Sequence, residues 1–475
     1  MSSVSMNYEL SIEGLNRLLA KFDETNYLEA RFQARSLNEV AFSNGDLEKI
    51  STIENSGLCV RALVDGCWGF SSVYSRSDEM FENCVTTAIS AAKTLSSTKK
   101  IKVKGLRPLR RPVTGVFRPK VNGPLQEVDI AEKIKVTKEA EAEARKCSVD
   151  IKSAYSSYLE ILDHKTIVNS DGAEFETFDS KPEFSITCIA NSGAESVTAS
   201  EGRGVTGGWK DLFQVNDHVQ YARRASHRAL RLLEAKHVSG ERSTVILDPG
   251  MVGLISHEAI GHMVEADFVL SGSIVSDKLD TMVASEKVTL VDSGRSLYSG
   301  AAAGTIAVDD EGVLAGDTVL IESGKLRSYL HNRETAFLFD TEPTGNARAF
   351  EYTDEPIIRM RNTFIKPGND KIEDIIKETK YGYLIKGPRN GQADANGEFM
   401  FGAQELHLIQ GGEITDLKRG ATISGNAFEV LKSVDMVGDD FCYGIGTGYC
   451  GKFQVAKVDG GGPHLRCKAT VGSLE

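Results

Sequence analysis

The run GMVGLISHEAIGHMVEADFVL, residues 250–270, constrains the fold of this chain more than any other stretch. Its apolar residues recur at three- and four-residue spacings, which predicts a helix that crosses a hydrophobic core. His257, Glu258 and His262 lie inside this apolar pattern. Polar side chains buried in such a helix need partners, and one bound metal ion can satisfy all three. The metal-free alternative is a buried helix whose histidines bond to backbone carbonyls.

The spacing of the two histidines is unusual. In the common zinc motif His-Glu-x-x-His the histidines are four residues apart, whereas His257 and His262 are five apart. At about 100° per residue, four residues return to within roughly 40° of the starting direction, but five overshoot to about 140°. Both can bind one metal ion only if the helix is widened, kinked or ended between them. Gly261 suits such a distortion, and single π-turns tend to occur at functional sites.

A catalytic zinc site has three protein ligands and one open position for water. Near the histidines, Glu265 and Asp267 are candidates for the third ligand, and a distant Cys or His is also possible because spacing alone does not choose. Glu258 adjoins the first histidine. A carboxylate there is the candidate general base, since it can take a proton from water activated by a metal.

Composition narrows the class of protein. The chain has 475 residues, of which 41% are hydrophobic and 26% charged, as in ordinary globular proteins of two or three domains. The net charge of -12 argues against a nucleic-acid binder. We expect no membrane span and no signal peptide, because no long apolar run is present. The eight cysteines form no Cys-x-x-Cys pair, which favours reduced thiols in a cytoplasmic protein.

Apolar periodicity predicts helices at residues 8–23, 77–96, 127–146 and 215–236. Short alternating runs lie between the first and second of these helices, and again between the third and fourth. They predict antiparallel strands separated by Gly, Asn and Asp. A new unit begins near residue 239. Residues 286–330 are glycine-rich and loop-like, and the last third of the chain has the pattern of short strands and glycine turns.

Residues 102–124 contain four prolines and seven basic side chains. The prolines exclude a helix or a central strand. Two interpretations are open. The segment is an anion or partner site, or it is an extended connector wrapped over an acidic surface, and we favour the connector.

With HEAIGH as its centre, the sequence resembles the TldD/PmbA metallopeptidases, on the TldD side. The resemblance extends to GLCVRALVDGCWGFSSV, the DDEG at 309–312, PTGNARAFEY, RNTFIKPGN and SVDMVGDD. It closes with GIGTGYCGK and a final VG. In order and rough spacing these motifs cover nearly the whole chain.

The resemblance implies an α+β fold with two domains. Residues 1–238 form an N-terminal α/β domain with antiparallel strands, and residues 239–475 form a β-rich C-terminal domain with a metal-binding helix. It makes His257, His262 and Cys450 the ligands of one Zn²⁺ per chain and Glu258 the catalytic glutamate. The element that contains Cys450 is one residue longer than the family pattern, so Glu265, Cys442 and Cys467 remain alternatives for the third ligand.

The function implied is zinc-dependent hydrolysis of peptide bonds in extended, unfolded peptides. We expect these peptides to bind as an added β-strand inside the cavity of a dimer. The second subunit is either another copy or a TldE/PmbA-like chain. The alternative is a non-catalytic peptide-binding or regulatory subunit of a protease complex, although the inactive partner in this family lacks the His-Glu motif. A metal-dependent hydrolase of non-peptide amides is a third possibility. We expect neither nucleic acid nor membrane as a partner.

Overall fold

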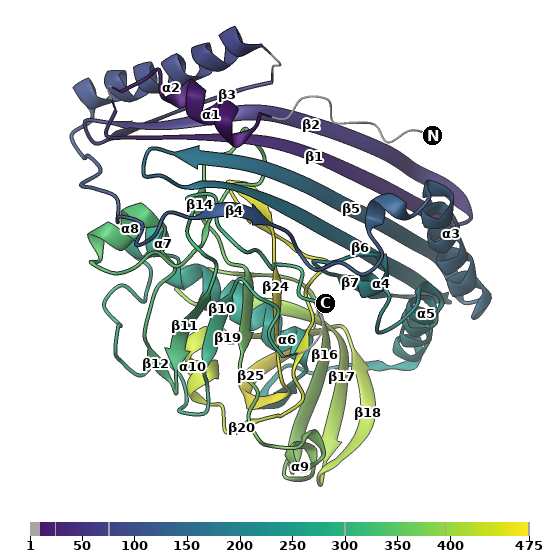
Figure 1. Cartoon of the computed structure of the whole chain (residues 1–475). Helices are drawn as coiled ribbons and strands as arrows, with labels where there is room; N and C mark the ends of the chain where they lie inside the picture. Colours follow the sequence, from purple (N-terminus) through teal and green to yellow (C-terminus); the bar gives the residue numbers. More distant parts are fainter. Residues whose placement is uncertain (1–9, 24, 75–76, 299–300, 395, 474–475) are drawn as a thin grey trace.

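The computed structural model describes residues 10–23, 25–74, 77–298, 301–394 and 396–473. Its fold is α+β, as predicted. A long, curved sheet from the first half of the chain lies over several smaller sheets from the second half (Figure 1). The first residues of the predicted helix 8–23 lie outside the described residues.

The N-terminal sheet has the strand order β3-β2-β1-β5-β6-β4, and β7 also pairs with β6. Its strands are β1 (Tyr27–Ser43), β2 (Asp46–Val64), β3 (Cys67–Val73), β4 (Thr114–Phe117), β5 (Ile151–Asn169), β6 (Glu174–Ser192) and β7 (Glu195–Gly204). All pairs are antiparallel except β4 with β6. The antiparallel arrangement predicted from the sequence is therefore confirmed.

The prediction of short strands was wrong here. β1, β2, β5 and β6 run without a break for 17 to 19 residues. Asn44-Gly45 and Asp65-Gly66 do turn the chain, with positive φ at each residue. Gly57 does not, because it stays paired with Gln33 inside the β1–β2 ladder. A glycine in the sequence indicates a possible turn, but pairing with the neighbouring strand keeps Gly57 extended.

The four predicted helices are present in the N-terminal half. They are α1 (Ile12–Leu19), α2 (Asp78–Thr98), α3 (Ile130–Lys146) and α5 (His218–Glu234). α2 buries Phe81, Val85 and Ala88 against the apolar face of β1 and β2. α3 and α5 cover the other end of the sheet, against β5 and β6 (Figure 1). The short helix η1 (Leu125–Glu127) precedes α3 in sequence, and the short helix α4 (Trp209–Leu212) precedes α5.

The proline-rich segment 102–124 is an extended connector, with β4 as its one strand, on the edge of the sheet. Arg107 lies 2.9 Å from Asp340 and 3.0 Å from Glu342. Arg110 lies 2.9 Å from Glu342 as well. The preferred interpretation, a connector over acidic residues, is confirmed for this part of the segment.

The second half contains a sheet of order β16-β9-β25-β19-β17-β18-β8, with β20 on β25, and a sheet of order β12-β11-β10-β15-β24-β21. The strands of the first are β8 (Lys236–His237), β9 (Glu241–Leu247), β16 (Tyr381–Ala393), β17 (Glu398–Gln410), β18 (Glu413–Arg419), β19 (Ala421–Asn426), β20 (Met436–Val437) and β25 (Leu465–Ser473). Those of the second are β10 (Leu290–Ser293), β11 (Asp317–Glu322), β12 (Lys325–Leu326), β15 (Asn362–Ile365), β21 (Cys442–Tyr443) and β24 (Asp459–Gly462).

Two small ladders and several short helices complete this half. The ladders are β13 (Ala347–Arg348) with β14 (Ile357–Ile358), and β22 (Tyr449–Lys452) with β23 (Gln454–Lys457). The helices include α8 (Arg333–Leu338), α9 (Ile372–Lys377) and α10 (Ala427–Lys432). Residues 286–330 are more ordered than the predicted loop, since they contain β10, β11 and β12. The 13-residue β16 and β17 are also longer than the short strands expected.

The largest apolar core of the described residues surrounds the predicted central helix. Met251, Ile255, Ile260 and Val264 pack in one buried cluster with side chains such as Phe401 from the surrounding sheets. The helix crosses a core, as the apolar pattern indicated. Among the described residues, no helix combines the length and apolar character needed to cross a membrane.

Candidate metal centre

Residues 249–270 form a helix of changing geometry. α6 (Pro249–Leu254) begins after Asp248, which caps it by accepting a hydrogen bond from the backbone N–H of Met251 at 2.8 Å. A π-helical turn, η2 (Ile255–Gly261), follows, and then the 3₁₀ turn η3 (His262–Val264) and α7 (Ala266–Leu270). Of the three distortions that would let the histidines meet, widening, a kink or an end of the helix, the structure has the first between His257 and His262.

The π-turn decides where the histidines lie. Because a π-helix bonds residue i to residue i+5, side chains five apart can share a face. The ring centroids of His257 and His262 lie 5.3 Å apart. Gly261 keeps ordinary helical angles, so it is not needed for an unusual conformation. It is needed for space, since a Cβ there would lie 2.0 Å from Sδ of Met360.

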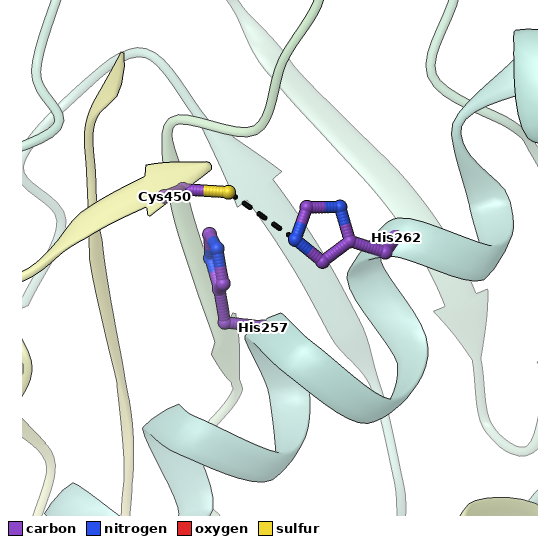
Figure 2. Close-up of side chains that lie close together, drawn as sticks. All are labelled: His257, His262 and Cys450. Atoms are coloured by element: carbon purple, nitrogen blue, oxygen red, sulfur yellow. Dashed lines mark hydrogen bonds between the residues drawn. The ribbon is translucent and has the colours of Figure 1, made fainter. Parts of the chain in front are cut away.

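The hairpin of β22 and β23 brings Cys450 to the histidines (Figure 2). Its Sγ lies 3.2 Å from Nε2 of His262. One donor atom from each of His257, His262 and Cys450 lies within 4.8 Å of the other two. The buried Arg359 fixes this hairpin by donating to the carbonyls of Cys450 and Gln454.

His257 is buried, with 1% of its surface exposed, and apart from the nearby Cys450 thiol neither of its ring nitrogens has a hydrogen-bond partner among the described residues. A buried polar group without a partner is destabilising by roughly 1–3 kcal/mol. The metal-free alternative required carbonyl partners for the histidines, and the structure does not provide them for His257. Two imidazoles and a thiol converging on one point suit a tetrahedral zinc ion with one position left for water.

Glu265 contacts the ring nitrogen of His262 that does not face Cys450, and Lys452 lies beside Glu265. Oε2 of the fully buried Glu265 lies 2.9 Å from Nδ1 of His262 and 3.1 Å from Nζ of Lys452. Lys452 also donates to Asp267 at 2.8 Å. Glu265 and Asp267, both candidate ligands in the sequence, therefore contact His262 and Lys452 in this structure and are not part of the three-residue cluster.

Glu258 lies on the side of His262 that faces Cys450. Its Oε2 is 3.7 Å from Nε2 of His262, and a third of its side chain is exposed. The carboxylate is thus close to the cluster and open to water. Of the two other cysteines considered, Cys442 is exposed and donates to the carbonyl of Tyr443, and Cys467 is buried in β25.

Charges in the cluster support ligation by sulfur. Burial acts to raise the pKa of Cys450, but the neighbouring imidazoles of His257 and His262 lower it to about 5. Burial acts to lower the pKa of His262, but Glu265 and Cys450 raise it to about 10. At neutral pH the metal-free cluster therefore contains a thiolate, the form of cysteine that binds metals.

Sequence reasoning missed Arg359 and Lys452. A signal for Lys452 was present, because side chains two residues apart in a strand lie on the same face, and Lys452 follows Cys450 by two. Nothing in the sequence indicated the contact of Arg359 with the Cys450 carbonyl.

Three nitrogen and sulfur donors beside a partly exposed carboxylate suit a catalytic metal site with a general base. Comparison with known proteins gives the family. The PmbA/TldA metallopeptidase C-terminal domain matches residues 240–473, the central domain matches 123–233 and domain 1 matches 28–92. The chain belongs to the PmbA/TldD family of metallopeptidases.

Relatives match over nearly their whole length. A metalloprotease of Methanocaldococcus jannaschii is 37% identical over 97% of this chain and 100% of its own. The zinc metalloprotease TldD homolog of Saccharolobus solfataricus is 28% identical over 93% of this chain and 95% of its own. The crystal structure of TldE from Thermococcus kodakarensis has the same fold, with a TM-score of 0.78 at 20% identity over 97% of this chain and 100% of that one.

Proposed function

We propose that this chain is a zinc-dependent peptidase of the His-Glu-x-x-x-His type, with one Zn²⁺ per chain held by His257, His262 and Cys450. One observation carries the proposal. The three donor atoms converge within 4.8 Å, and outside this cluster the described residues offer no partner for either ring nitrogen of the buried His257. The relative from Saccharolobus solfataricus, named as a zinc metalloprotease, supports zinc as the metal.

Bound zinc would supply a Lewis acid for the peptide carbonyl and the attacking water. Residues of the chain supply the proton transfer and orient the metal ligands. Glu258, placed near the cluster and open to solvent, accepts the proton of the attacking water and returns it to the leaving amine. Glu265 holds Nδ1 of His262, which leaves Nε2 directed toward Cys450.

The substrate on this proposal is an extended, unfolded peptide that adds as a strand beside the metal centre. The strand β22 contains Cys450 and, within the described part of the chain, pairs with β23 alone. An unpaired strand edge offers backbone donors and acceptors to any extended peptide whatever its sequence. This arrangement accounts for broad sequence specificity without a dedicated side-chain pocket.

The last part of the proposal concerns the oligomeric state. We infer a dimer, with a second copy or a TldE-like chain, whose enclosed cavity admits unfolded peptides and excludes folded proteins. The match of the fold to TldE supports a partner of that kind. We place the protein in the cytoplasm.

The test uses a mixture of unfolded peptides, with mass analysis of products before and after treatment with a chelator. We expect cleavage that the chelator stops and added zinc restores. His257→Ala and Cys450→Ala should lose most of the zinc and the cleavage together. A chain that binds peptides and one zinc but never cleaves them would instead be the non-catalytic subunit, and cleavage that persists without zinc would overturn the proposal.

A further inference from the structure

A second site candidate lies away from the metal centre. A cavity of about 740 Å³ is lined by residues of the N-terminal sheet, of the proline-rich connector and of the second half of the chain. Its walls come from β1, β5, β6, the connector and the segments around 206, 305 and 348. None of His257, Glu258, His262 and Cys450 lines it. A volume of this size is typical of sites for small molecules.

The cavity is rich in positive charge, although the whole chain is acidic. Eight Lys or Arg and five Asp side chains line it. Four of the basic side chains are also buried: Arg35, Lys181, Arg348 and Lys457 are 8%, 4%, 9% and 2% exposed. Buried cations are costly unless anions neutralise them, so such a group needs either carboxylate partners or a bound anion.

Carboxylates of the protein neutralise only part of this charge. Arg35 lies 2.8 Å from Asp163, and Lys165 lies 2.7 Å from Asp310. Lys181 has a longer contact of 3.4 Å with Asp179, Arg295 lies 2.7 Å from Asp317, and Lys457 pairs with Glu183. Arg348, Arg118 and Lys120 are left without a carboxylate partner among the described residues. Of the other two aspartates, Asp211 accepts hydrogen bonds from Asn122 and Gly208 and has no cation beside it. Burial and the neighbouring Glu311 raise the pKa of Asp309 well above its usual value, and Asp309 accepts hydrogen bonds from backbone N–H groups such as that of Ala347.

Arg348 has no carboxylate partner among the described residues. It donates to the backbone carbonyls of Met360 and Lys457. Burial and the nearby Arg359 lower the pKa of Arg348 to about 10. Burial also lowers the pKa of Lys181 to about 8, and the cations Arg348 and Lys457 contribute to that shift. Burial is the main cause of both shifts, and the neighbouring cations add to it.

The connector adds two exposed cations, Arg118 and Lys120, for which the described residues offer no ion-pair partner. The guanidinium of Arg118 lies 3.4 Å over the ring of Phe178. Phe117 and Phe350 also line the cavity. Phe178 is also stacked on His164, with ring centroids 4.0 Å apart, so Phe117 and Phe350 are the rings left for a ligand with a charged group and a planar apolar body.

We propose that this cavity binds a small organic anion, whose carboxylate or phosphate group is held by the cations without a carboxylate partner, Arg348, Arg118 and Lys120, and whose planar body lies against Phe117 or Phe350. Arg and Lys recognise both head groups through charge-assisted hydrogen bonds. The second interpretation of segment 102–124, an anion site, thus applies to its later part, while Arg107 and Arg110 bind acidic residues of the protein.

Calorimetric titration of the full chain with three probes that share one benzene ring tests the proposal. The probes are phenyl phosphate, benzoate and the uncharged benzyl alcohol. We expect one or both anions to bind at one per chain, more weakly as salt is added, and benzyl alcohol not to bind. The stronger of the two anions identifies the head group. Peptidase activity is not part of the readout, so the result is independent of the metal centre.

Variants locate the binding. The double substitution Arg118→Ala/Lys120→Ala, at exposed positions, should weaken anion binding by roughly tenfold, as expected for the loss of charged contacts. Arg348→Met should weaken it further, and if that protein does not fold the double variant still decides. Arg110→Ala is the matched control, because Arg110 is an exposed connector arginine outside the cavity. The proposal is overturned if neither anion binds at millimolar concentration, if benzyl alcohol binds equally well, or if Arg110→Ala weakens binding as much as the double variant.

Discussion

Glu265 accepts a hydrogen bond from Nδ1 of His262 across 2.9 Å, with its carboxylate fully buried and 3.1 Å from Nζ of Lys452. This contact fixes which nitrogen of His262 faces Cys450. It also explains how a carboxylate can stay ionised inside the protein, because His262 and Lys452 lower the pKa of Glu265 against the opposing effect of burial.

The first prediction follows from that contact. Glu265→Gln keeps the size of the side chain but removes its charge, so His262 loses its anionic partner. We expect zinc affinity to fall by roughly tenfold to a hundredfold, the usual effect of losing a partner of a metal-bound histidine. Competition with a fluorescent chelator measures it. Asp267→Asn is the control, since Asp267 contacts Lys452 and not His262. An equal loss of zinc affinity in both variants would mean that the effect comes from removing a charge beside Lys452, and not from the contact with His262.

The second prediction concerns catalysis. Glu258→Gln cannot accept a proton, and turnover should fall by roughly a hundredfold to ten-thousandfold, the usual contribution of a general base. Zinc content and peptide affinity should remain, because Glu258 is not among the three clustered donors. Turnover near that of the natural chain would place the base elsewhere, and loss of zinc would make Glu258 a ligand.

The third prediction uses the pKa of Cys450. Its lowered pKa means that the thiolate forms as pH rises through about 5, below the ordinary range for cysteine. Burial raises the pKa of Cys59 and of Cys188 to about 11, so these thiols stay protonated at neutral pH. In the metal-free protein, ultraviolet thiolate absorbance should rise with a midpoint near pH 5. This step should be absent from Cys450→Ser, and a step shared by both proteins would assign it to another group.

The fourth prediction concerns assembly. Light scattering at micromolar concentration should give the mass of a dimer, either of this chain alone or after addition of a TldE-like chain. The reason is functional: a peptidase open to solvent would cleave any unfolded segment it met, whereas an enclosed cavity selects by access. A monomer with full activity on peptides and on large unfolded proteins alike would contradict the enclosed cavity.

Part of this site could be predicted from local sequence. Five-residue spacing of His257 and His262 on one apolar helix required a distortion if the two were to meet, and the structure has a π-turn there. Cys450 could not be found this way. It lies in a different strand, and only a resemblance to a family connected it with the helix. Local periodicity describes neighbours along one element, whereas the third donor depends on how distant elements pack.

The fold was predictable to a similar degree. Helices and antiparallel pairing follow from apolar periodicity, but strand length does not. Gly57 shows the reason, since its pairing with Gln33 on the neighbouring strand overrides its preference for turns. The roles of Glu265 and Lys452 also required the structure, because each depends on a contact between a helix and the hairpin after residue 448.

X-ray absorption at the zinc edge, on the zinc-loaded natural chain, tests the central claim most directly. Bonds from zinc to sulfur and to nitrogen differ clearly in length, at about 2.3 Å and about 2.0–2.1 Å. With His257, His262 and Cys450 as ligands, the spectrum should show one sulfur neighbour, two imidazole nitrogens and one further light atom. A spectrum with nitrogen and oxygen neighbours only, and no sulfur, would contradict the account.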